Sequence, residues 1–129
     1  MAQSEPINAP AILVVEDEPF ICMYLVDAIE SEGFKVYEAA NADEAITTME
    51  AHPDIRVLFT DIDMPGSMDG VKLSHYVRRR WPPVRIFVAS GRRRPRAEDM
   101  PLSSIFLPKP YGASEMQQIF DAAAGAELV

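Results

Sequence analysis

Five short apolar runs, each followed closely by polar residues, alternate along this chain with segments of helical periodicity. The runs cover residues 11–15, 34–39, 56–60, 84–89 and 104–107, and their length is typical of strands in a sheet covered on both faces. Apolar residues three and four positions apart predict helices at about 19–32, 42–51, 69–81 and 113–124. Such alternation indicates βαβ units, so we expect one three-layer α/β domain with helices on both faces of a five-stranded parallel sheet.

The segment between the fourth and fifth runs does not fit a regular helix. Pro95 interrupts any helix over 92–100, because proline lacks the amide N–H and its ring clashes with the preceding turn. We nevertheless expect about five helices around the five strands. Arg92, Arg93, Arg94 and Arg96 crowd this segment and predict a solvated loop, with a docking patch for an acidic partner segment as the alternative.

Size and composition restrict the class of protein. The chain has 129 residues, enough for one domain with one core, which we place at 10–125 between tails at 1–9 and 126–129. The formal net charge of −8 disfavours nucleic acid as a partner, because phosphates repel an acidic surface. No signal peptide or membrane-spanning run is visible, and Cys22 is the only cysteine, so we expect a cytoplasmic protein without a membrane partner.

Polar residues stand where the predicted strands end. Glu16 and Asp17 follow the first run, Asp61 the third, Ser90 the fourth and Lys109 the fifth. Parallel α/β sheets bind ligands at the carboxyl ends of their strands, so we expect these five side chains to share one cleft. Two carboxylates about 4 Å apart repel by roughly 4 kcal/mol at an effective dielectric near 20, so a positive group must offset the repulsion.

This set of residues suits phosphoryl transfer. An oxygen-rich site without histidine favours a hard cation, above all Mg²⁺. We expect Glu16 and Asp17 to ligate it, with the backbone carbonyl of Asp63 nearby, while the hydroxyl and the amine of the set contact phosphoryl oxygens. Asp61 ends the central strand and is the natural nucleophile, since a carboxylate that attacks phosphorus forms an acyl phosphate.

The motifs resemble those of response-regulator receiver domains of two-component signalling. The resemblance rests on "VVEDE" at Glu16 and Asp17, "DIDMPGSMDG" at Asp61, "VASG" at Ser90 and "FLPKP" at Lys109, in this order within residues 10–125. It implies a doubly wound, flavodoxin-like sheet with strand order 2-1-3-4-5. It further implies a sensor histidine kinase or a histidine phosphotransfer protein as phosphoryl donor, and an unknown downstream protein as target.

The resemblance also assigns the phosphoacceptor and the metal ligands. Asp61 would accept the phosphoryl group of a phosphohistidine. Mg²⁺ would be held by Glu16, Asp17, Asp61 and the backbone carbonyl of Asp63. The protein would catalyse only its own phosphorylation and dephosphorylation, so we do not expect an enzyme that turns over a separate substrate.

Three further assignments come from the same resemblance. Ser90 and Lys109 would bind the phosphoryl group. Phe106 would be an aromatic switch residue that moves inward as Ser90 reorients. The Lys109–Pro110 peptide bond would be cis.

The chain departs from the usual receiver pattern at three places. The loop "MPGSMDG" is one residue longer than usual, which predicts a bulge near the site. Ser90 stands where threonine is more common, so the hydroxyl is kept and the methyl group is lost. Pro95 breaks the fourth helix, so the segment that forms part of the usual output face departs from the family pattern.

We expect a stand-alone phosphorylation switch that acts through protein–protein contacts, because few residues follow the last predicted helix. One alternative is a haloacid-dehalogenase-like phosphatase that uses Asp61 and Asp63 as its paired acids. Another is a scaffold with the receiver fold whose binding is independent of phosphorylation. A nucleotide-binding domain is less favoured, because no glycine-rich loop follows the first run.

Overall fold

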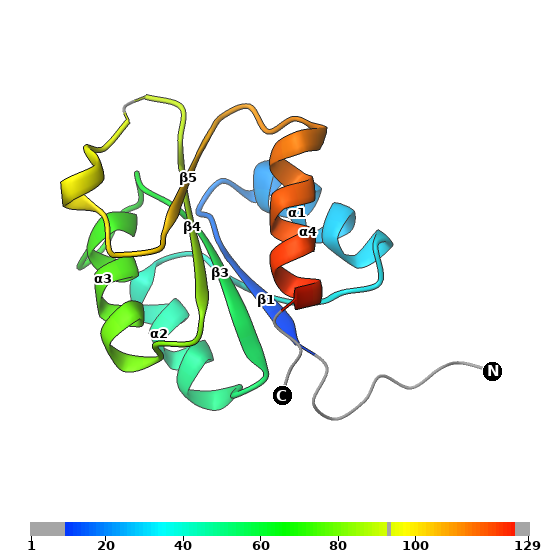
Figure 1. Ribbon diagram of the computed structural model, residues 1–129, viewed down its shortest axis with the longest axis horizontal. Coiled ribbons are helices and arrows are strands. Elements are labelled where there is room, and N and C mark those ends of the chain that lie inside the picture. The colour runs from blue at the N-terminus through cyan, green and yellow to red at the C-terminus, as the bar shows by residue number, and fades with distance from the viewer. Residues whose placement is uncertain (1–9, 93, 126–129) are drawn as a thin grey trace.

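The computed structural model describes residues 10–92 and 94–125. Five parallel strands form one sheet in the order β2-β1-β3-β4-β5 (Figure 1), which confirms the predicted fold class and strand order. The strands are β1 (Ala11–Val15), β2 (Lys35–Ala39), β3 (Ile55–Asp61), β4 (Arg85–Ser90) and β5 (Ile105–Pro108). Each strand starts and ends within one residue of the run that predicts it.

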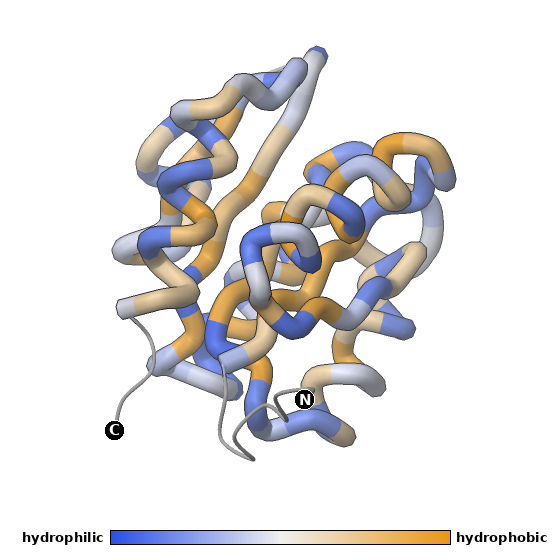
Figure 2. Tube along the Cα trace, turned by 90° about the vertical axis from the view of Figure 1, so that its right-hand side faces the viewer, coloured by the Kyte–Doolittle hydropathy of each residue, from blue (hydrophilic) through white to orange (hydrophobic). Residues whose placement is uncertain are grey.

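Helices cover both faces of the sheet. They are α1 (Pro19–Ser31), α2 (Ala42–Ala51), α3 (Gly70–Arg80) and α4 (Ala113–Gly125). α1 and α4 lie on one face, and α2 and α3 lie on the other (Figure 1). Successive residues of β3 point to opposite faces, so Leu58 joins the apolar cluster under α2 and α3 whereas Phe59 joins the cluster under α1 and α4. The apolar parts of the trace accordingly run along the strands between the helices (Figure 2).

Side-chain caps set where two of the helices begin. Asn41 accepts a hydrogen bond from the Glu44 N–H at 2.9 Å, and the Glu44 carboxylate accepts one from the Ala40 N–H at 2.8 Å. This reciprocal pair at the start of α2 is the capping pattern that the spacing of Asn41 and Glu44 predicts. Asp69 caps α3 in the same way, accepting from the Lys72 N–H at 2.9 Å. These caps satisfy N–H groups that have no partner inside the helix.

The segment between β4 and β5 corrects the expectation of about five helices. Four α-helices are present in the described part of the chain, and this segment contains only a 3₁₀ turn, Ala97–Asp99. Pro95 explains the loss, since it cannot donate to the preceding turn. The turn is tied to α3 by a 2.8 Å hydrogen bond between His75 Nε2 and the Asp99 carbonyl oxygen. Arg93 and the predicted tails at 1–9 and 126–129 lie outside the described residues.

The helices are short compared with the thickness of a bilayer. α1 and α4 have 13 residues each, whereas a bilayer span takes about 20. No helix within 10–92 and 94–125 is both long and apolar enough to cross a membrane.

The loop between β3 and α3 carries the additional residue noted in the sequence. Gly66 in this loop has φ +107°, a left-handed conformation that glycine adopts without strain. The neighbouring Ser67 hydroxyl donates to Asp43 Oδ1 at 2.9 Å, which fastens the loop to α2. The loop ends at Gly70, whose N–H donates to the Ile62 carbonyl oxygen at 2.9 Å. The returning chain therefore packs directly against the end of β3.

We predict that Gly70→Ala destabilises the protein strongly. A Cβ at this position would lie 2.0 Å from the Asp61 carbonyl oxygen and 2.9 Å from the Ile62 Cα, both of them backbone atoms. Backbone cannot move aside as a flexible side chain can, so we expect a loss of roughly 3 kcal/mol in the free energy of unfolding, measured by urea titration. Gly125→Ala is the matched control, because a Cβ there meets nothing within 4 Å. Equal effects of the two substitutions would contradict the prediction.

Candidate functional site

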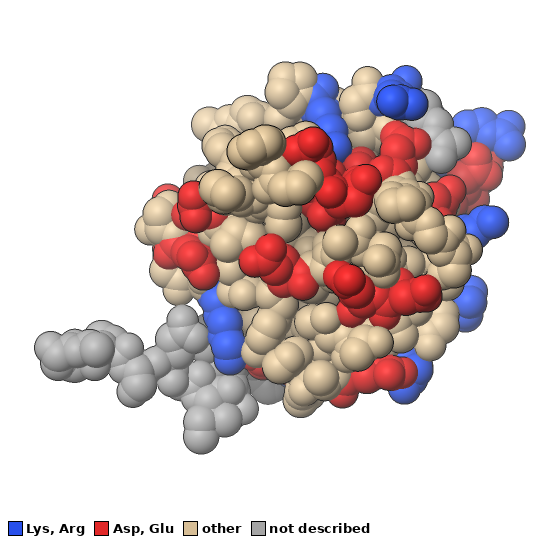
Figure 3. Space-filling model, turned by 180° about the vertical axis from the view of Figure 1, so that it is seen from behind, with Lys and Arg blue, Asp and Glu red and all other residues tan. Residues whose placement is uncertain are grey.

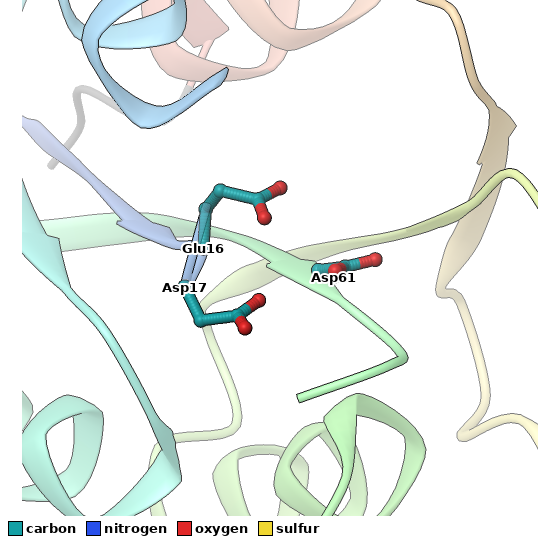
Figure 4. Close-up of side chains that lie close together, drawn as sticks. All are labelled: Glu16, Asp17 and Asp61. Carbon is teal, nitrogen blue, oxygen red and sulfur yellow. The ribbon is translucent and has the colours of Figure 1, made fainter. Parts of the chain in front are cut away.

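The ends of β1 and β3 bring three carboxylates together (Figure 4). Glu16 and Asp17 follow β1 directly, and Asp61 is the last residue of β3. One oxygen of each carboxylate lies within 4.8 Å of the others. The alignment follows from parallel pairing, because Val15 of β1 stands opposite Thr60 of β3 and the acids come next on each strand.

Lys109 lies between two of these acids. Its Nζ is 3.2 Å from Glu16 Oε1 and 3.3 Å from Asp61 Oδ1. Its backbone N–H donates to the Ser90 carbonyl oxygen at 3.2 Å, which holds the end of β5 against the end of β4. The Lys109–Pro110 peptide bond is cis. One cation from the edge strand therefore bridges carboxylates from the two central strands.

The burial of this cluster shifts its protonation equilibria. Glu16 is 5% exposed and Asp61 is 6% exposed. Burial raises the pKa of the Asp61 carboxyl, and the charge of Lys109 opposes the rise. Burial likewise raises the pKa of Glu16, with the Glu18 N–H bond to Oε2 at 3.1 Å opposing it. Burial alone would lower the pKa of Lys109, but the charges of Asp61 and Glu16 outweigh it and raise the pKa.

Ser90 ends β4 beside the same cluster and is 3% exposed. Its hydroxyl donates to Asp63 Oδ2 at 3.1 Å and accepts a hydrogen bond from the Arg92 N–H at 3.1 Å. The sequence singled out the backbone carbonyl of Asp63 as a metal ligand, which stays a prediction, whereas the structure shows the Asp63 side chain in contact with Ser90. The Asp-x-Asp spacing of Asp61 and Asp63 was the available signal, but it does not specify which side chain Asp63 contacts.

Two aromatic side chains, one on β5 and one after it, lie near this end of the sheet. Phe106 is partly buried against the α2–α3 cluster, and the Arg94 guanidinium lies over its ring at 4.9 Å. Tyr111 packs edge-on against Phe59 with ring centroids 5.1 Å apart. Burial raises the pKa of the Tyr111 hydroxyl, and Glu16 and Asp61 add to the rise, so this ring stays neutral beside the acids. Sequence reasoning missed Tyr111 because no motif distinguishes it from a core aromatic.

The donor set fits a hard dication. All three converging side chains offer oxygen, and one ammonium offsets only part of their combined negative charge. Oxygen ligands and residual negative charge are what Mg²⁺ prefers. The acids that could hold the cation are Glu16, Asp17 and Asp61.

Comparison with known families agrees with this geometry. The family model described as "Response regulator receiver domain" matches residues 12–121. The match begins at the second residue of β1, covers the other four strands and ends within α4. It therefore includes every residue of the cluster described above.

Individual relatives come from longer proteins. The chain is 34% identical over 113 residues to the sensor kinase CckA of Brucella abortus (strain 2308), covering 84% of this chain and 12% of that protein. It is 32% identical over 112 residues to the transcriptional regulatory protein ResD of Bacillus subtilis (strain 168), covering 84% of this chain and 45% of that protein. The chain thus spans less than half the length of each of these relatives.

Solved structures share the fold. The receiver domain of the hybrid histidine kinase CckA superposes with a TM-score of 0.72 at 28% identity, covering 88% of this chain and 97% of that one. A CheY-like receiver domain protein from Methanospirillum hungatei JF-1 gives a TM-score of 0.78 at 21% identity, with 92% and 96% covered. The response regulator TrrA from Thermotoga maritima, in complex with Mg²⁺ and BeF, gives 0.76 at 24%, with 88% and 98% covered. These structures share the fold, and the family model over residues 12–121 shows that the chain belongs to the family of response regulator receiver domains.

Proposed function

We propose that this receiver domain is phosphorylated on Asp61 by a phosphohistidine of a sensor histidine kinase or a histidine phosphotransfer protein. The observation that carries the proposal is the buried pairing of Asp61 with Lys109 at 3.3 Å, next to Glu16, Asp17 and Ser90 at the carboxyl edge of the sheet. The group contains a nucleophilic oxygen, a fixed cation and a hydroxyl donor. These are the parts that phosphoryl transfer needs.

The transfer is a displacement at phosphorus. An Asp61 carboxylate oxygen forms a bond to phosphorus while the phosphorus–nitrogen bond to the donor imidazole breaks, and the imidazole leaves with the electron pair. Lys109 Nζ stays close to Asp61 Oδ1 because Glu16 holds it from the other side at 3.2 Å. Its charge is thereby positioned to contact an oxygen of the incoming phosphoryl group.

We propose Glu16, Asp17 and Asp61, with the backbone carbonyl of Asp63, as the ligands of Mg²⁺. When bound, the ion neutralises negative charge that gathers between the carboxylates and the phosphoryl oxygens. The relative crystallised with Mg²⁺ and BeF supports a divalent ion in receivers of this fold. In this chain, Asp17 is exposed whereas Glu16 and Asp61 are buried, so Asp17 faces the side from which an ion enters.

Ser90 must change partner when Asp61 is phosphorylated. In the unphosphorylated protein its hydroxyl donates to Asp63 Oδ2, so it is directed away from a phosphoryl oxygen on Asp61. We propose that it rotates to donate to that oxygen, and that Phe106 on β5 responds as an aromatic switch. Phe106 is held by Arg94 on its outer face, so inward movement also releases this cation–π contact.

Two other functions receive less support. A haloacid-dehalogenase-like phosphatase would need Asp63 as a free general acid, whereas its carboxylate accepts the Ser90 hydrogen bond. A scaffold independent of phosphorylation does not require the buried acids and Lys109 to converge. Partner binding that is the same for wild type and for a phosphoacceptor variant would favour the scaffold.

Phosphorylation by acetyl phosphate should depend on Asp61 and on Mg²⁺. We expect Asp61→Asn to abolish phosphate incorporation measured by intact-protein mass spectrometry, because the amide is not nucleophilic. Asp27→Asn, an exposed change on α1, should leave incorporation unchanged. Phosphate incorporation that persists in Asp61→Asn would show that another residue is the acceptor. Hydrolysis of more than one equivalent of a phosphate ester would instead favour the phosphatase alternative.

Removing one ligand should weaken Mg²⁺ binding without unfolding the protein. Asp17→Asn replaces a charged oxygen ligand by a neutral one at an exposed position, so we expect at least about tenfold lower affinity in a calorimetric titration with MgCl₂. Asp27→Asn removes the same charge on α1 and should change the affinity less than twofold. Equal losses in the two variants would mean that the ion is attracted only by overall charge.

Without Mg²⁺, Asp61→Asn should stabilise the protein at neutral pH. The folded-state pKa of Asp61 is raised by burial, so its ionised form is less favourable in the folded protein than in the unfolded one. The native state then binds more protons, and stability falls as pH rises above the ordinary carboxyl range. We expect the advantage of Asp61→Asn, measured by urea unfolding in EDTA, to shrink as pH falls toward about 4 and to vanish below it. A variant less stable than wild type at pH 7 would refute this.

A further inference from the structure

A pocket with both polar and apolar walls lies away from the proposed phosphorylation site. It has a volume of about 340 Å³ and opens between the end of α3 and the start of β4 and β5. We call it the arginine pocket, and its wall includes Arg78, Pro82, Pro83, Arg85, Leu102 and Ser103. Strands rise about 3.3 Å per residue, so the start of β4 lies about 17 Å from Ser90 at its other end. A partner in this pocket would leave the phosphorylation site open.

Arg78 brings a positive charge to the pocket wall without a carboxylate to balance it. Its guanidinium donates from one terminal nitrogen to the Pro82 carbonyl oxygen at 2.7 Å and to the Val84 carbonyl oxygen at 2.9 Å. Its Nε is buried and has no hydrogen-bond partner. Among the described residues no acid forms an ion pair with it, and burial lowers its pKa. A guanidinium in this state is costly unless an anion joins it.

The opposite rim carries an exposed aliphatic side chain on a strained turn. Leu102 is 85% exposed, and Ser103 has φ +66°, the left-handed conformation that residues other than glycine rarely adopt. Ser104 closes the turn by donating from its N–H and its hydroxyl to the Pro101 carbonyl oxygen at 3.3 and 2.6 Å. The turn therefore holds the leucine out in water.

Three unfavourable features thus meet at one pocket: an unbalanced guanidinium, an exposed leucine and a left-handed serine. A ligand with a carboxylate next to an aliphatic group would offset the charge of Arg78 and cover Leu102. The two consecutive prolines add a rigid apolar wall with no N–H to satisfy. The charge of the surroundings agrees, because the basic side chains of this acidic protein gather along the margin on the α3 side (Figure 3).

We propose that the arginine pocket binds a peptide segment of a partner protein that carries acidic side chains on either side of an aliphatic one. The carboxylates contact Arg78 and Arg85, and the aliphatic side chain packs on Leu102 and the proline wall. Because the pocket is at the amino ends of the strands, such a partner and the phosphoryl donor can bind at the same time. The site would tether the domain independently of the state of Asp61.

The test is a titration of ¹⁵N-labelled full-length protein with three blocked peptides, followed by NMR. The peptides are acetyl-Ser-Glu-Leu-Glu-Ser-amide, its glutamine analogue with Gln for both Glu, and its serine analogue with Ser for Leu. We expect the first peptide to shift the backbone amides of 84–85 and 102–104, with at least fivefold higher affinity than either analogue. Absence of these shifts, or equal shifts with sodium acetate or inorganic phosphate at the same concentration, would overturn the proposal.

Surface variants separate the pocket from general charge attraction. Arg85→Glu and Leu102→Ser change exposed positions of the wall, so the fold is kept, and each should weaken binding of the first peptide at least fivefold. Arg79→Glu makes the same charge change on an exposed neighbour outside the wall and should weaken binding less than twofold. A loss in Arg79→Glu equal to that in Arg85→Glu would overturn the pocket as the binding site.

Discussion

The Lys109 ammonium between Glu16 and Asp61 is the contact on which the rest of the site depends. Two carboxylates that are almost completely buried would repel each other and disfavour the folded state, and one cation within 3.3 Å of both makes their burial tolerable. Because the single ammonium of Lys109 balances only part of the charge of the three carboxylates, the site keeps a net negative charge, which suits Mg²⁺. Stability and the proposed function therefore oppose each other here, because the charges that we propose to receive the ion and the phosphoryl group are the ones that burial disfavours.

Parallel strand pairing makes this contact possible over a long stretch of sequence. Glu16 and Lys109 are separated by 93 positions, yet both follow the carboxyl ends of strands in one sheet. The backbone is also tightly packed at the strand ends. Gly70 lies so close to the Asp61 carbonyl oxygen that no side chain fits at position 70. The backbone at Asp61, the proposed phosphoacceptor, is fixed by its neighbours, and the proposed change on phosphorylation is limited to side chains such as Ser90 and Phe106.

The sequence was a good guide to elements and a poorer one to side-chain partners. Strand positions followed from short apolar runs, and the α2 cap followed from Asn41 and Glu44, because both depend on local spacing. The count of helices was wrong by one, although Pro95 marked the place, since a broken helical pattern does not tell whether a shorter helix survives. The Ser90–Asp63 hydrogen bond could not be predicted, because it depends on the path of a loop whose length departs from the usual pattern.

What the sequence determined by itself is the alternation of strands and helices and the polar residues that end the strands. These follow from periodicity and from the rule that parallel sheets present their strand ends at one edge. Only the tertiary structure decided which groups come together: that Lys109 bridges Glu16 and Asp61, that Ser90 donates to Asp63, and that Arg78 and the exposed Leu102 line one pocket. Such contacts join residues from separate elements, and their distances are set by packing that no local pattern encodes.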